Sequence, residues 1–141
     1  MARTDIRAVD GFEASVDRAK ALVDAGADAI FPEAMASLDE FAAMRAAVDV
    51  PLLANMTEFG KGELHTAQQL ADVGMNIVIW PVSLLRLAMG AAEAGLDELE
   101  ASGNLVGKLG AMQHRAELYD LIDYEGYNRF DSSVFNFRVA R

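Results

Sequence analysis

Four short apolar segments, each running into polar residues and each followed by a helical pattern, constrain the fold of this chain more than any other feature. The segments are 2–5, 29–33, 51–57 and 76–81. They recur about every 22 to 27 residues, which is the spacing of β-α units rather than of a solenoid repeat. Short apolar runs are typical of parallel strands that are buried on both faces. The pattern therefore predicts an α/β fold built from four consecutive β-α units.

Four such units are only half of a closed (β/α)8 TIM barrel. The chain has 141 residues, whereas a complete barrel typically needs roughly 250. With 52% hydrophobic residues it can still bury a core as one domain, or as one part of a domain. The first and fourth strands would be unpaired edges of a parallel sheet, and such edges pair with other chains. We therefore expect that the chain is not a stable monomer and associates with a second copy or with a separate half-barrel.

The segments between the strands carry helix signals. One amphipathic stripe is formed by Phe12, Val16, Ala19 and Val23. Residues 37–40 and 66–69 match capping boxes, and Gly26 and Gly74 stand where helices should end. From Ser83 the pattern is helical again, which completes the fourth β-α unit.

The C-terminal part of the chain is less regular. We predict a helix break at Gly95 and a last helix over about 111–122. The tail 124–137 is rich in Tyr, Phe and Asn and shows little periodicity. This composition predicts an extended arm that needs a surface to pack on.

Composition excludes several function classes. Twenty-two acidic residues against twelve basic ones give a net charge of -10, which argues against nucleic acid or an anionic membrane as a partner. The absence of cysteine excludes disulfides, thiolate metal sites and cysteine nucleophiles within the chain. The polar start is unlike a signal peptide, and the apolar stretches are interrupted before bilayer length. The expected location is cytoplasmic.

Polar residues stand at the predicted strand ends, where parallel α/β proteins place their chemistry. They are Arg3, Asp5, Glu33, Asn55, Thr57 and Glu58. Any one of them could be a cap or a loop salt bridge, but four consecutive units with the same pattern favour a site. Guanidinium groups bind carboxylates through paired hydrogen bonds, so the expected ligand carries carboxylates. Arg86, one turn into the next helix, either snorkels along apolar neighbours or points into the same mouth.

The other motifs in the sequence do not indicate a catalytic or metal-binding site. His65 and His114 have no second histidine at metal-ligand spacing and are interpreted as surface or capping residues. Residues 58–62 fail the spacing of a phosphate loop, and no serine stands in a nucleophile elbow. We therefore assign no catalytic residue and no metal ligand to this chain.

Four motifs together resemble a known family. They are Ala-Arg-Thr-Asp at 2–5, Phe-Pro-Glu-Ala at 31–34, Leu-Ala-Asn-Met-Thr-Glu-Phe-Gly at 53–60 and Met-Gln-His-Arg-Ala-Glu-Leu-Tyr at 112–119. In this order and spacing the chain resembles the 2-methylisocitrate lyases of the isocitrate lyase and phosphoenolpyruvate mutase superfamily. The resemblance covers only the C-terminal half of such an enzyme. It implies a single partial domain, with a half barrel over 1–104 and a C-terminal helix and arm over 105–141, of the kind that subunits of the superfamily exchange.

The resemblance also implies which residues contact substrate: Arg3, Glu33, Asn55, Met56, Thr57, Arg86 and Arg115. Three arginines could neutralise the three carboxylates of 2-methylisocitrate, which the family cleaves to pyruvate and succinate in the methylcitrate cycle of propionate catabolism. The family reaction uses Mg2+, and the metal ligands and the catalytic cysteine lie in the other half of the barrel. We therefore expect this chain to be inactive alone and to form a homo-oligomer when complete.

Two alternatives stay open at this point. The chain could belong to another member of the superfamily, such as an oxaloacetate decarboxylase or a phosphonate-pathway mutase. It could also be a catalytically inactive half-barrel that only assembles or binds carboxylates.

Overall fold

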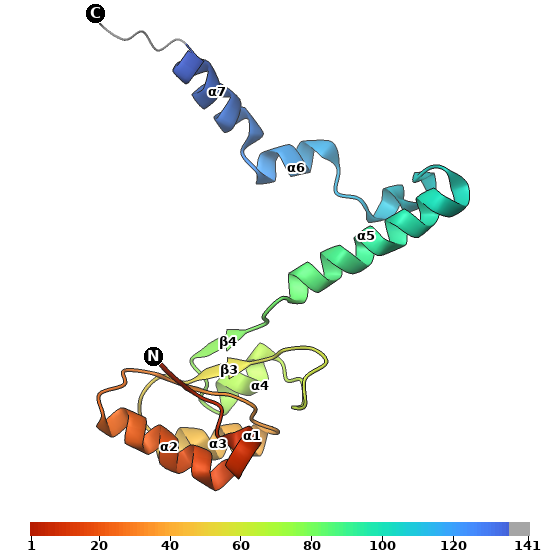
Figure 1. Ribbon diagram of the computed structural model, residues 1–141. Helices are drawn as coiled ribbons and strands as arrows, with labels where there is room; N and C mark the ends of the chain where they lie inside the picture. The colour runs from red at the N-terminus through yellow and green to blue at the C-terminus, as the bar shows by residue number, and fades with distance from the viewer. Residues whose placement is uncertain (136–141) are drawn as a thin grey trace, which may run out of the picture. The chain divides into compact units, whose positions relative to one another are not determined.

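The chain divides into two units, Met1–Met89 and Gly90–Arg141 (Figure 1). The structure is a computed structural model, and it describes residues 1–135. The first unit contains all the strands of the described part, the first four helices and the start of the fifth, and the described part of the second unit is helical. The predicted division at residue 104 stays a prediction.

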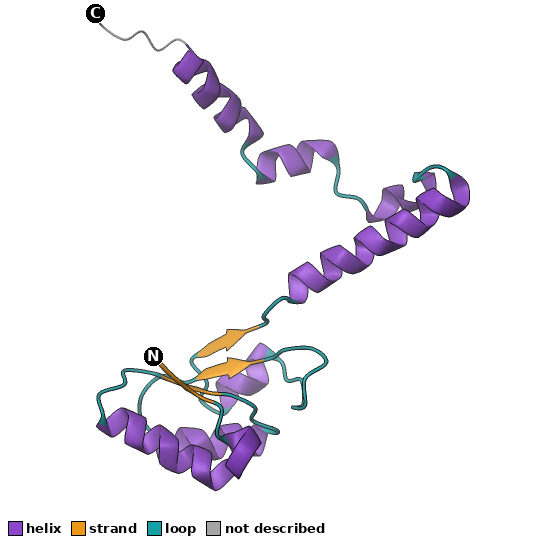
Figure 2. Cartoon of the chain, in the orientation of Figure 1, coloured by secondary structure: helices purple, strands orange, loops and turns teal. Residues whose placement is uncertain are grey.

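The four strands lie where the sequence predicts them. They are β1 (Ala2–Thr4), β2 (Ile30–Pro32), β3 (Leu53–Asn55) and β4 (Ile77–Ile79). β1 pairs in parallel with β2, and β3 pairs in parallel with β4 (Figure 2). A parallel bridge between Ile30 and Leu52, and a hydrogen bond of 2.9 Å from the Ile30 amide to the Pro51 carbonyl, join the two pairs. The strands therefore follow one another in chain order, as consecutive β-α units require.

The helices of the first unit confirm most of the predicted signals. They are α1 (Arg7–Asp10), α2 (Phe12–Asp24), α3 (Leu38–Ala47), α4 (Ala67–Asp72) and the start of α5 (Ser83–Ser102). α2 carries the predicted stripe, and Gly26 follows it at a positive φ of 99° that favours glycine. Thr66 and Gln69 make a complete capping box at α4. The short helix α1 was not predicted, because its single turn is too brief for a periodic pattern.

The two faces of the strands differ in burial. Ile30, Leu52 and Ala54 are fully buried against the helices, with α2 and α3 on one side of the strands (Figure 1). The pairing register puts Phe31 and Ile77 on the other face, and Ile77 is 40% exposed. The apolar surface on this second face is therefore partly open to solvent.

A partly buried ion pair ties α1 to α3. Arg7 donates from Nη2 to Glu40 Oε1 at 2.6 Å and from Nε to Oε2 at 3.0 Å. Ser37 caps α3 as predicted by accepting from the Glu40 amide at 3.4 Å. The Glu40 side chain does not complete the capping box. Its carboxylate instead accepts from the Ala36 amide at 2.7 Å, because Arg7 holds it on that side.

This pair predicts a pH dependence. The hydrogen bond from Arg7 lowers the pKa of Glu40 below its ordinary value of 4.5. A depressed carboxyl pKa contributes stability that is present above 4.5 and lost as the pH falls through the folded-state value. We expect Glu40→Gln to lower the melting temperature at pH 7 and to flatten its decline below pH 4.5. Melting curves over pH 7 to 3 check this, with exposed Glu13→Gln as the control; parallel curves for wild type and Glu40→Gln would contradict it.

The second unit corrects the predictions for the C-terminal part of the chain. It contains the rest of α5, the 3-10 helix η1 (Val106–Ala111), α6 (Arg115–Leu121) and α7 (Tyr124–Phe135). α5 continues through Gly95 without a break, because the alanines around it favour a helix enough to offset the cost of one glycine. The predicted last helix over 111–122 begins only at Arg115, since η1 and a turn precede it.

The predicted extended arm is also wrong over the described residues. α7 is a helix through Phe135, whereas the last two residues of the predicted arm, 136–137, lie outside the described part. Tyr127, Phe130 and Val134 stand at helical spacing, and this period is masked by the intervening Asn and Ser. No helix in residues 1–135 is long and apolar enough to cross a membrane.

Candidate functional site

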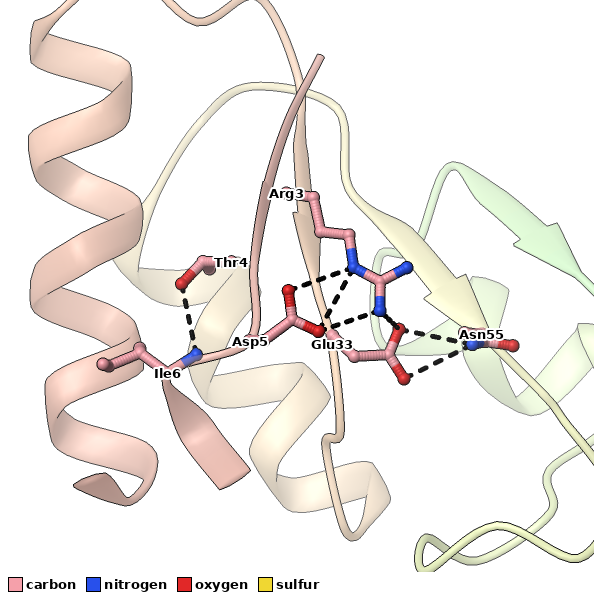
Figure 3. A network of polar contacts seen from close by, with 6 residues as sticks. All are labelled: Arg3, Thr4, Asp5, Ile6, Glu33 and Asn55. Atoms are coloured by element: carbon pink, nitrogen blue, oxygen red, sulfur yellow. Dashed lines mark hydrogen bonds and ion pairs between the residues drawn. The ribbon is translucent and has the colours of Figure 1, made fainter. Parts of the chain in front are cut away.

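Three strand ends bring charged and amide groups together. Arg3 of β1 lies between two carboxylates, with Nη2 2.8 Å from Asp5 Oδ1 and 3.5 Å from Glu33 Oε2 (Figure 3). On the other side of Glu33, the Asn55 amide nitrogen donates to both of its oxygens at 3.4 and 3.3 Å. The sequence predicted this meeting because carboxyl ends of neighbouring parallel strands share one edge of the sheet.

The electrostatics of the network are set by Arg3. Its hydrogen bonds lower the pKa of Asp5 and keep that carboxyl ionised. The same contact raises the pKa of Arg3. The guanidinium carbon also lies 4.7 Å from the centre of the Phe31 ring, which fixes the plane of the group. About half of the Arg3 side chain stays exposed, so it can accept a further anion.

A cavity of about 250 Å³ opens beside this network. Glu33, Asn55 and Thr57 line one wall, and the loop residues 60–64 line another. Lys61 is the one cation in this lining, and the sequence reasoning did not single it out. Its position between two glycines gives no periodic or motif signal, so only the folded loop reveals it.

Asn55 presents one unused acceptor. Its Oδ1 atom is buried and has no hydrogen-bond partner within residues 1–135. A buried amide oxygen without a partner costs free energy. Met56, the next residue, is 2% exposed and packs in the core, where its sulfur accepts from the His65 amide at 3.3 Å. Alternation along the strand thus puts Asn55 and Thr57 at the cavity and turns Met56 away from it.

Arg86 occupies a neighbouring hollow of about 300 Å³, lined by Glu58, Phe59, Ser83, Arg86 and Leu87. Its Nη1 donates to the Glu58 carbonyl at 2.9 Å and lies 3.6 Å from the Glu58 carboxylate. Ser83 donates to that carboxylate at 2.7 Å and is the main cause of the lowered pKa of Glu58. The structure therefore does not bring Arg86 into the Arg3–Glu33–Asn55 network, but ties it to the loop that borders the cavity.

Strained backbone surrounds the cavity and the hollow. Ala34, Phe59 and Val82 have positive φ angles of 66°, 62° and 57°. Each stands in a loop that follows a strand. Residues other than glycine adopt this conformation at a cost of about 1–3 kcal/mol, and such strain gathers at functional sites.

Arg115 and the two histidines are the other residues named from the sequence. Arg115 is exposed, opens α6 in the second unit, and has no ion-pair partner among residues 1–135. His114 caps α6 by accepting from the Ala116 amide, as predicted. The surface interpretation of His65 is wrong, because its side chain is only 7% exposed and lies 3.8 Å from Glu63.

Within 1–135 no three His, Asp or Glu side chains lie close enough together to hold a metal ion. The carboxylates of Asp5 and Glu33 are both engaged by Arg3. Arg3, beside the cavity, and Lys61, in its lining, are cations suited to pairing with an organic anion, and Asn55 and Thr57 are neutral hydrogen-bonding groups in the same lining.

Consecutive parallel β-α units with polar residues at their strand ends are the arrangement of α/β proteins that place a site at one edge of a parallel sheet. The chain belongs to the phosphoenolpyruvate phosphomutase family, which matches residues 1–100. It is 53% identical over 136 residues to a probable 2-methylisocitrate lyase 2 of Corynebacterium glutamicum, covering 96% of this chain and 44% of that protein. It is 47% identical to a 2-methylisocitrate lyase of Aeropyrum pernix, covering 95% and 44%. The resemblance drawn from the sequence motifs is thereby confirmed.

Solved structures agree on the fold. A 2,3-dimethylmalate lyase of the phosphoenolpyruvate mutase and isocitrate lyase superfamily matches with a TM-score of 0.79 at 28% identity, over 94% of this chain and 46% of that one. An oxaloacetate acetylhydrolase bound to oxalate gives 0.82 at 29%, over 96% and 46%. A phosphonopyruvate hydrolase with oxalate and Mg2+ gives 0.71 at 25%, over 96% and 48%. The chain spans less than half the length of these relatives.

Proposed function

We propose that this chain is the C-terminal half of a (β/α)8 barrel enzyme that cleaves 2-methylisocitrate to pyruvate and succinate. The observation that carries the proposal is the meeting of Arg3, Glu33 and Asn55 at three consecutive strand ends, in a chain 43–53% identical to proteins named 2-methylisocitrate lyase. The open apolar face of the strands supports a barrel whose remaining strands come from the N-terminal part of the complete enzyme.

The residues of the chain bind and orient the substrate. Arg3 pairs with one carboxylate of the substrate, and the free Asn55 Oδ1 accepts from its hydroxyl. Thr57 adds a neutral contact, and Arg86 adds positive charge at the loop that borders the cavity. Arg115 is proposed as a further substrate contact in the complete enzyme. Fixing the carboxylates around the bond that breaks lowers the barrier by orientation and charge stabilisation.

Mg2+ is proposed as the cofactor, with all of its protein ligands outside this chain. The metal would polarise the forming pyruvate, as carboxylate-bound divalent ions do in lyases. The phosphonopyruvate hydrolase that shares this fold was solved with Mg2+ and oxalate, which supports the assignment. The acid and base that move protons are likewise assigned to the rest of the enzyme.

The function is tested with a complete enzyme, in which this chain is joined to the N-terminal part that its relatives have and that this sequence does not include. Pyruvate release from 2-methylisocitrate and from oxaloacetate is measured in parallel with Mg2+. Pyruvate from 2-methylisocitrate supports the proposal. Turnover of oxaloacetate alone would replace it with the oxaloacetate-cleaving alternative, and no turnover of either would favour an inactive half-barrel. The 141-residue chain alone is expected to be inactive.

The second unit is proposed to pack on another subunit. Tyr127, Phe130 and Phe135 of α7 are 67%, 63% and 95% exposed, more apolar surface than a solitary helix keeps in water. We expect the chain to elute from size exclusion larger than 15.2 kDa and to shift with concentration. Phe130→Ser with Tyr127→Ser should move it toward the monomer. A compact monomer that melts cooperatively would contradict this proposal.

A further inference from the structure

The Arg7–Glu40 ion pair lies directly behind the cavity, although neither residue lines it. Ala8 and Phe41, the next residues in the chain, both line the cavity. The pair itself is more than two-thirds buried on each side, with side-chain exposures of 30% and 19%. Its position therefore links α1, which follows the strand of Arg3, to α3, which follows the loop of Glu33.

Glu40 also contacts the loop between β2 and α3. The carboxylate accepts from the Ala36 amide at 2.7 Å while both of its oxygens accept from Arg7. Ala34 in the same loop has a φ of 66°, so the loop needs outside contacts to hold this conformation. Glu33 begins the loop and is the central carboxylate of the strand-end network.

The β2–α3 loop also contacts the β3–α4 loop. The Glu63 amide donates to the Ala36 carbonyl at 3.2 Å, so Ala36 is bonded to Glu40 on one side and to the β3–α4 loop on the other. At Gly62 a Cβ atom would lie 2.6 Å from the Met35 carbonyl oxygen, which shows how closely the two loops approach. Both loops line the cavity, and Lys61 stands in the second.

We propose that Arg7 and Glu40 are positioning residues, which hold the β2–α3 and β3–α4 loops together over the anion-binding cavity. The effect of these two residues on substrate binding rests on the proposed function. Their effect on how rigidly the two loops are held does not, and it can be measured separately. Removing the Arg7 charge would leave the Glu40 carboxylate without its cation and free to leave Ala36. The Ala36 and Glu63 amides would then lose protection together, whereas the central strands would not change.

The test uses Arg7→Met, with Glu40→Gln as the second variant if Arg7→Met does not fold. Arg18→Met, an exposed arginine of α2, is the matched control. In the 141-residue chain, amide hydrogen exchange at Ala36 and Glu63 is expected to accelerate about tenfold or more, with Ile30 unchanged. Unchanged exchange at Glu63, or equal acceleration at Ile30, would overturn the inference whatever the activity of the enzyme.

The kinetic experiment uses the complete enzyme, in which this chain is joined to the N-terminal part found in its relatives. For 2-methylisocitrate, Arg7→Met is expected to raise KM about tenfold and to leave kcat within about twofold, because loop order affects binding more than chemistry. Arg7→Lys, which keeps the charge but not the paired contact, should recover part of the loss. A KM equal to that of Arg18→Met would overturn the positioning role. A wild type that cleaves no 2-methylisocitrate would instead overturn the proposed function, and the exchange result would then decide this inference alone.

Discussion

Replacing Arg3 by alanine is expected to lower kcat/KM for 2-methylisocitrate by about a hundredfold or more in the complete enzyme. The side chain is the only cation that contacts both Asp5 and Glu33 within the described residues. Under the proposed function, its loss removes the charge-assisted pairing with a substrate carboxylate and leaves Asp5 and Glu33 to repel the substrate. The rate of pyruvate release at several substrate concentrations measures the effect.

Two further variants make the Arg3 result specific. Arg3→Lys keeps the charge but loses the paired geometry and the plane over Phe31, so it should recover only part of the activity. Arg18→Ala removes an exposed arginine far along α2 and should change kcat/KM by less than about twofold. Equal values for Arg3→Ala and Arg18→Ala would show that Arg3 does not contact the substrate.

Replacing Leu52 by alanine is expected to lower the free energy of unfolding by about 2–5 kcal/mol. Leu52 is fully buried at the bridge that joins the two strand pairs, so truncation leaves a cavity where β2 meets β3. Denaturant unfolding of the 141-residue chain, followed by circular dichroism, measures the change.

Leu84→Ala is the matched control for Leu52. Leu84 is 80% exposed in the first turn of α5, and alanine favours a helix at least as well as leucine. Its change should stay within about 0.5 kcal/mol. Similar losses for the two variants would mean that the strands do not form the core described above.

The strands and most caps of the first unit could be predicted because their signals are local. The apolar run 76–81 and the Thr66–Gln69 capping box each occupy only a few consecutive residues, and the fold reproduces them. The meeting of Arg3, Glu33 and Asn55 was predictable for a different reason. Parallel strands in chain order must align their carboxyl ends, so residues at successive strand ends become neighbours.

The rest could not be predicted because it depends on contacts between distant segments. Arg7 and Glu40 are 33 positions apart, and no spacing rule relates a turn after one strand to a helix after the next. Ser83 and Glu58 are 25 positions apart, so the separate hollow of Arg86 was invisible too. In α7 the apolar residues at helical spacing are separated by residues of low helix propensity. The composition of the segment therefore favoured an extended arm.

A crystal structure of the complete enzyme with oxalate and Mg2+ tests most directly whether the strand ends form an anion site. We expect oxalate in the cavity beside Glu33, with Arg3 or the Asn55 amide in hydrogen-bond contact with one of its carboxylates. Oxalate bound elsewhere, with Arg3 still closed on Asp5 and Glu33 and the cavity filled only by solvent, would contradict it.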